Sequence, residues 1–117
     1  MRTLGQKRAE FALDKILEIP QDKKERFKPF SAGAPSMILQ NGFGQALAFW
    51  IAKGKNEHMT MFNIVKEWLC QNNLAKGQNV PEFIGDISRM KQSEYLTAQK
   101  ETLALLEWVK RYANAGL

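Results

Sequence analysis

The fold of this chain is decided by one uncharged segment, residues 29–52, which reads PFSAGAPSMILQNGFGQALAFWIA. A membrane span needs about 20 predominantly apolar residues, and prolines, glycines and amides are too frequent here for one. The apolar residues instead surround a helix axis, which is typical of a helix enclosed by other helices. We therefore expect a buried central helix whose apolar residues point to all sides: Met37, Ile38, Phe43, Leu47, Phe49, Trp50 and Ile51.

Two glycines interrupt this segment. Gly42 and Gly44 each cost a helix about 1 kcal/mol relative to alanine. We expect the close approach of a neighbouring helix, or of a partner's backbone, to offset that cost. Asn41, beside them, is expected to be a core or kink residue rather than a catalytic one.

The flanking parts of the chain show helical periodicity. Apolar side chains recur every three to four residues in four segments: residues 2–18, 58–74, 81–90 and 94–114. Pro20 is expected to end the first helix, and a short helix over residues 22–28 is expected to end at Pro29. No segment alternates with the period of a strand. We therefore expect an all-α fold, a compact bundle of about five to six helices in a single domain over residues 1–117.

The net charge of +5 is confined to the first half of the chain. Residues 1–55 contain ten Lys or Arg and five Asp or Glu, whereas residues 56–117 contain seven of each kind. This asymmetry is typical of a protein with one surface facing a polyanion, and solubility alone is the alternative explanation. The candidate residues for that surface in the first half are Arg8, Lys15, Lys23, Lys24, Arg26, Lys28, Lys53 and Lys55.

Two features favour a cytoplasmic protein. Charged residues recur from Arg2 to Asp14, so the N-terminus lacks the continuous apolar run of a signal peptide. Cys70 is the single cysteine and has no partner for an internal disulfide, which suits a reducing compartment.

The sequence offers little for catalysis. His58 is the only histidine, and no cysteine or carboxylate is spaced to complete a triad or a metal site with it, so we expect a surface or capping residue. The carboxylates of residues 10 and 14, and of residues 82 and 86, lie one helical turn apart and are expected to form solvated polar faces. No nucleotide-binding loop is present. We therefore expect no catalytic residue, no metal ligand and no cofactor.

A helix-turn-helix over residues 62–85 is an alternative interpretation. Its second helix would enter the major groove of DNA, where cations and amides should meet the bases and phosphates. Glu82 and Asp86 precede the first cation, Arg89, so the charge pattern opposes DNA docking.

Two stretches together resemble a known family. Residues 34–49, APSMILQNGFGQALAF, and residues 106–113, LEWVKRYA, are similar to the small subunit of the Cmr complex, the type III-B CRISPR RNA-guided effector. Phe43 stands where the family more often has leucine. The resemblance covers nearly the whole chain, and its motif positions are expected in the core or at an interface: Pro35, Ile38, Asn41, Gly42, Phe49 and Trp108.

The resemblance implies a non-catalytic, all-helical subunit. Several copies would stack along the guide and target RNA, beside the backbone subunits and the large subunit of the complex, and would meet RNA phosphates without reading bases. It adds Lys110 and Arg111 to the candidate RNA-facing residues. Either could instead be structural, with Arg111 paired to Glu107 or stacked on an aromatic ring. The alternative function is a structural adaptor that docks only protein partners, through the apolar region of residues 35–50 or through exposed Trp and Met residues.

Overall fold

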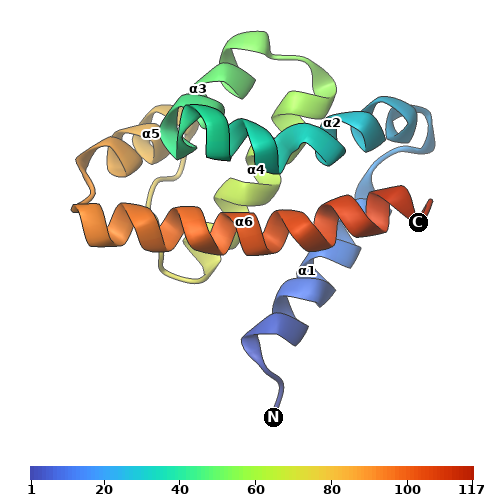
Figure 1. Ribbon diagram of the computed structural model, residues 1–117, viewed down its shortest axis with the longest axis horizontal. Helices are drawn as coiled ribbons and strands as arrows, with labels where there is room; N and C mark the ends of the chain where they lie inside the picture. The colour runs from blue at the N-terminus through green and yellow to red at the C-terminus, as the bar shows by residue number, and fades with distance from the viewer.

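The computed structural model describes residues 1–117 and contains six α-helices and no strand (Figure 1). The all-α bundle of five to six helices is therefore confirmed. The helices are α1 (Leu4–Glu18), α2 (Gln21–Asn41), α3 (Phe43–Lys53), α4 (Asn56–Gln71), α5 (Val80–Arg89) and α6 (Gln92–Asn114).

The long helix α6 organises the bundle. It packs against α1 on one side and against α2 on the other, and α4 crosses behind (Figure 1). Helices α2 and α6 run antiparallel: Lys24 near the start of α2 reaches Leu117 after α6, whereas Gly44 just after α2 reaches Tyr95 at the start of α6. The N-terminal end of α2 and the C-terminal end of α6 therefore lie together.

One apolar cluster of 24 buried residues joins the helices. Helix α4 has the most buried side chains, because it packs against α2, α3 and α6. Trp68 of α4 and Trp50 of α3 are the largest buried side chains, and the other buried residues of α4 are Met61, Phe62, Ile64, Val65 and Leu69.

The single helix expected in residues 29–52 is wrong, because the segment contains the second half of α2 and all but the last residue of α3. The chain turns at Gly42, whose φ of 92° and ψ of 153° belong to a region that is essentially open only to glycine. A consequence is that Phe49 is 44% exposed rather than buried. The expected close approach holds for Gly44, whose N–H donates to the Tyr95 hydroxyl at 2.7 Å. It does not hold for Gly42, which no neighbour approaches.

The expected helix end at Pro29 is also wrong. Helix α2 continues through Pro29 and Pro35 to Asn41. An interior proline costs a helix about 3 kcal/mol, because it removes a donor and crowds the preceding turn. Here one face of α2 is buried from Phe27 to Ile38, on both sides of Pro29, and tertiary packing of this kind overrides a local stop signal. That face contains Phe27, Ser31, Ala34, Pro35 and Ile38.

Candidate nucleic-acid interface

The N-terminal half of α2 carries four cations within six residues. Phe27 is buried and fixes this part of the helix against the core, while Lys23, Arg26 and Lys28 are exposed and form no ion pair. Lys24 is half-buried and donates to the carbonyl oxygen of Leu117 at 2.6 Å. Three free cations therefore face solvent on this half of α2, beside the carboxylates of Asp22 and Glu25, which are also exposed and form no ion pair.

The turn between α3 and α4 adds Lys53 and Lys55. Both side chains are exposed on either side of Gly54, which ends α3 in the left-handed conformation. This turn lies beside α2, because Phe30 packs against His58 in the first turn of α4 with ring centroids 4.4 Å apart. Phe30 follows Arg26 by one helical turn and shares its face. We call Lys23, Arg26, Lys28, Lys53 and Lys55 the basic surface; Lys28, two residues after Arg26, lies on the side of α2 that faces the end of α6.

The C-terminal end of α6 brings the two candidates of the family motif to the same end of the bundle. Arg111 is exposed and forms no ion pair, whereas Lys110 lies 3.7 Å from Glu107. The alternative pairing of Arg111 with Glu107 is not formed. A hollow of about 310 Å³ separates this end of α6 from α2, and its charged lining residues are Lys24, Glu25 and Lys28.

Arg8 and Lys15 do not join the basic surface. Arg8 is only 16% exposed, and its Nε and Nη2 donate to the carboxylate of Glu101 at 2.6 and 3.0 Å. Lys15 lies 2.7 Å from Glu67 and 3.6 Å from Glu18. Burial acts to lower the pKa of Lys15, but the hydrogen bonds and charges of the two glutamates raise it. Both cations are therefore neutralised within the protein.

His58 is not the surface residue that the sequence suggested. Its side chain is 13% exposed and packs against the rings of Phe30 and Phe49, and its Nδ1 is buried without a hydrogen-bond partner. Burial lowers the pKa of His58, the charge of Glu57 opposes this, and the charges of Lys55 and Lys53 lower the pKa further. The neutral imidazole is therefore the form that fits this site.

The lowered pKa of His58 predicts a pH dependence of stability. In the unfolded chain, His58 is protonated below the ordinary histidine pKa of 6.5, whereas in the folded chain it is protonated only at a lower pH. Stability contributed by His58 is therefore present above about pH 6.5 and lost as the pH falls through the folded pKa. Urea unfolding at about pH 7.5 and about pH 5.5 should show this loss, and the His58→Phe variant should not. An equal loss in both proteins would contradict the prediction.

The motif positions divide into two groups. Pro35 and Ile38 are buried in the face of α2 that packs into the bundle, and Trp108 is half-buried against Tyr112. Asn41 and Phe49 are exposed on either side of the break at Gly42. Together with Met37 and Gln45, they line a second hollow of about 340 Å³, and sequence reasoning did not single out Gln45.

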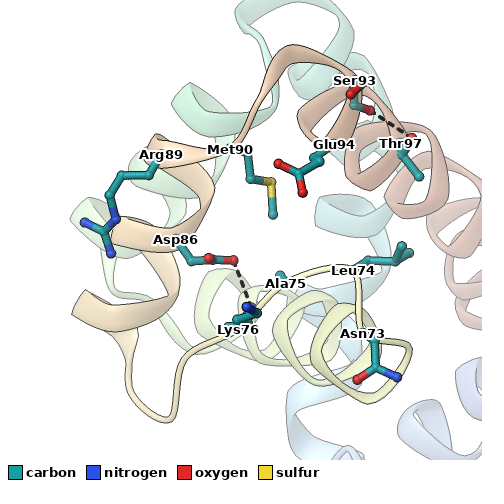
Figure 2. Close-up of a pocket in the computed structure, with 10 residues that line it drawn as sticks. All are labelled: Asn73, Leu74, Ala75, Lys76, Asp86, Arg89, Met90, Ser93, Glu94 and Thr97. Atoms are coloured by element: carbon teal, nitrogen blue, oxygen red, sulfur yellow. Dashed lines mark hydrogen bonds between the residues drawn. The ribbon is translucent and has the colours of Figure 1, made fainter.

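The largest hollow, of about 480 Å³, lies away from the basic surface, between the α4–α5 loop and the α5–α6 turn. Figure 2 shows Glu94 and Met90 directed into it, Asp86 accepting a hydrogen bond from the Lys76 backbone at 2.9 Å, and Arg89 turned away. Its lining combines two carboxylates, Asp86 and Glu94, with two cations, Lys76 and Arg89, and so has no excess of positive charge for a phosphate.

Other chemical features of the chain are few. No three His, Cys, Asp or Glu side chains gather as a metal-binding group, and no helix is long and apolar enough to cross a membrane. Burial and the charge of Asp86 raise the pKa of the Cys70 thiol, against the opposing charge of Lys66. The thiol is therefore held in its less reactive, protonated form.

Comparisons with known proteins agree on one family. The family model described as CRISPR-associated protein (Cas_Cmr5) matches residues 4–116. The CRISPR system Cmr subunit Cmr5 of Thermus thermophilus is 29% identical, over 98% of this chain and 96% of the relative. The CRISPR system Cmr subunit Cmr5 of Thermotoga maritima is 28% identical, over 95% of this chain and 82% of the relative. A crystal structure of a CRISPR-associated Cmr5 family protein, also from Thermus thermophilus, superposes with a TM-score of 0.78 at 27% identity, over 98% of this chain and 97% of that one.

Proposed function

Because the chain belongs to the CRISPR-associated Cas_Cmr5 family of small Cmr subunits, we propose that it is a non-catalytic component of the type III-B effector that contacts phosphates along the guide and target RNA. The observation that carries this proposal is the free positive charge on α2, where Lys23, Arg26 and Lys28 are exposed without ion pairs.

Phosphate neutralisation is the mechanism that this surface supports. Exposed Lys and Arg side chains bind phosphates and release condensed counterions, which makes the affinity depend on salt rather than on sequence. Lys53 and Lys55 extend the surface from α2 across to the α3–α4 turn, and Arg111 lies at the neighbouring end of α6. Target choice is left to base pairing with the guide.

The proposed partners are the backbone and large subunits of the Cmr complex and further copies of this chain, in the cytoplasm. Exposed leucines outside the basic surface supply apolar contact area for them, with Leu39 68% and Leu96 51% exposed. The same leucines favour the second candidate function, an adaptor that binds only proteins. The response to salt separates the two functions, because an apolar interface lacks the steep salt dependence of phosphate binding.

Neutralising Arg26 and Lys28 together should weaken RNA binding and flatten its salt dependence. Each lost phosphate contact on single-stranded RNA reduces the magnitude of the slope of log affinity against log salt by about 0.7. The slope of the Arg26→Gln, Lys28→Gln variant should therefore be smaller by about 1.4. Fluorescence anisotropy of a labelled RNA between about 50 and 200 mM salt measures this.

The matched control removes two exposed cations elsewhere. Lys76→Gln with Lys91→Gln changes the net charge equally at the far end of α6 and should leave the slope close to that of the unaltered protein. An equal decrease of RNA affinity and of salt slope in the two double variants would show that only the total charge of the protein matters. Absence of any RNA binding at low salt would contradict the proposed function itself.

A further inference from the structure

The hollow at the α2–α3 break is built from two residue pairs. Met37 and Asn41 lie one turn apart at the end of α2, and Gln45 and Phe49 lie one turn apart on α3. Residues four apart share a helix face, so each pair presents one wall. The turn at Gly42 then sets the two walls against each other.

Phe49 is more exposed to solvent than an aromatic core residue would be. It is the only aromatic among the large exposed apolar side chains, although its ring touches His58 on the inner side with centroids 6.2 Å apart. The Nζ of Lys53 lies 5.6 Å from the centroid of the Phe49 ring. An exposed cation–π contact of this kind is weak, so the ammonium is free to turn toward an anion beside the ring.

The two amides in the hollow are also unused. The side chains of Asn41 and Gln45 are exposed, and neither forms a hydrogen bond within the protein. Each amide offers both donors and an acceptor, which matches the edge of a nucleobase. Aromatic side chains that stack bases, with neighbouring cations on the phosphates, are how proteins hold single-stranded RNA.

We propose that this hollow binds one unpaired nucleobase of RNA, stacked on Phe49, with its edge facing Asn41 and Gln45 and an adjoining phosphate on Lys53. The inference rests on the proposed function, because Lys53 belongs to the basic surface, and it adds a base contact to a surface otherwise suited to phosphates. A protein side chain is the less fitting occupant, since two of the four lining residues are amides and the adjacent charges are positive.

The test compares two ligands and two variants of the full chain. The ligands are a single-stranded RNA and an abasic ribose-phosphate chain of the same length. Phe49→Leu keeps the apolar volume and removes the aromatic face. Leu39→Ala is the control, because it removes an exposed apolar side chain of α2 that does not line the hollow. Thermal unfolding checks that both variants fold.

Phe49→Leu is expected to lower the affinity for RNA by at least about fivefold, to leave the affinity for the abasic chain unchanged and to keep the salt slope of the unaltered protein. Leu39→Ala should bind both ligands normally. If Phe49→Leu binds RNA normally, or weakens both ligands alike, the base site is refuted while phosphate binding stands. If the unaltered protein binds neither ligand at low salt, the proposed function fails and the base site fails with it.

Discussion

Replacing Glu101 with alanine should lower the free energy of unfolding by about 3 kcal/mol. The Glu101 carboxylate is 11% exposed and accepts from Arg8 at 2.6 and 3.0 Å and from the indole Nε1 of Trp68 at 2.9 Å. Its removal leaves a buried guanidinium without a counter-charge and a buried N–H without an acceptor. Breaking a buried pair on one side costs more than the pair contributes, because the remaining charge stays desolvated.

Urea unfolding followed by circular dichroism measures this loss, and Glu10→Ala supplies the control. Glu10 pairs with Arg2 at 2.7 Å near the same end of the chain as Arg8, but the two side chains are 59% and 51% exposed. An exposed pair contributes at most about 1 kcal/mol. Equal effects of the two substitutions would show that Glu101 is not a structural anchor.

Protonation of Glu101 in acid should reproduce part of the stability loss expected for the Glu101→Ala variant. Burial acts to raise the pKa of this carboxyl, but the hydrogen bonds from Arg8 and Trp68 and the charge of Arg8 lower it overall. Its contribution to stability is therefore present above the ordinary value of 4.5 and is lost as the pH falls through the lower, folded pKa.

Gly77→Ala should destabilise the protein by about 3 kcal/mol or more. Gly77 has a φ of 128°, which L side chains rarely adopt, and a Cβ placed there would lie 2.5 Å from the backbone N of Phe83 and 2.7 Å from its Cα. Backbone atoms at the start of α5 cannot yield as a flexible side chain would. The α4–α5 loop must therefore withdraw from α5 and loosen the packing of the buried Phe83.

Alanine at Gly33 should instead raise the free energy of unfolding. Gly33 lies inside α2, is exposed, and has no atom within 4 Å of the position of a Cβ. Alanine there should stabilise the protein by about 0.5–1 kcal/mol, because glycine loses more chain entropy on folding. Thermal and urea unfolding of both variants test the pair, and a stabilised Gly77→Ala would contradict the geometry of the loop.

Periodicity predicted most of the helices but not the course of α2. Helices α1, α4, α5 and α6 were predicted to within a few residues, because their apolar stripes are local features of the sequence. Pro29 is a strong local stop signal, and the burial that outweighs it comes from helices α4 and α6, which are distant in sequence. The break at Gly42 was missed because apolar residues occur on both sides of it.

The candidate surface was predictable only where charge is dense along the chain. Lys23, Arg26 and Lys28 are close together in sequence, and all three are exposed in the fold. The ion pair of Arg8 was not predicted because its partner, Glu101, lies 93 residues away, and no spacing rule connects them. The hollow beside Phe49 was missed for the same kind of reason, since the angle at Gly42 creates it.

The packing of α1 against α6 has a consequence for how the chain folds as it is synthesised. Helix α1 is synthesised well before α6, on which it mainly packs, and a helix of 15 residues is marginally stable alone in water. Phe11 also packs against Trp68 of α4, with ring centroids 4.8 Å apart, so the apolar face of α1 is only partly covered until residues 92–114 have been synthesised. Closure of this long loop comes late and is slow, because its entropy is lost before the contacts form. During translation the nascent chain therefore depends on its central helices for order until α6 can pack against α1.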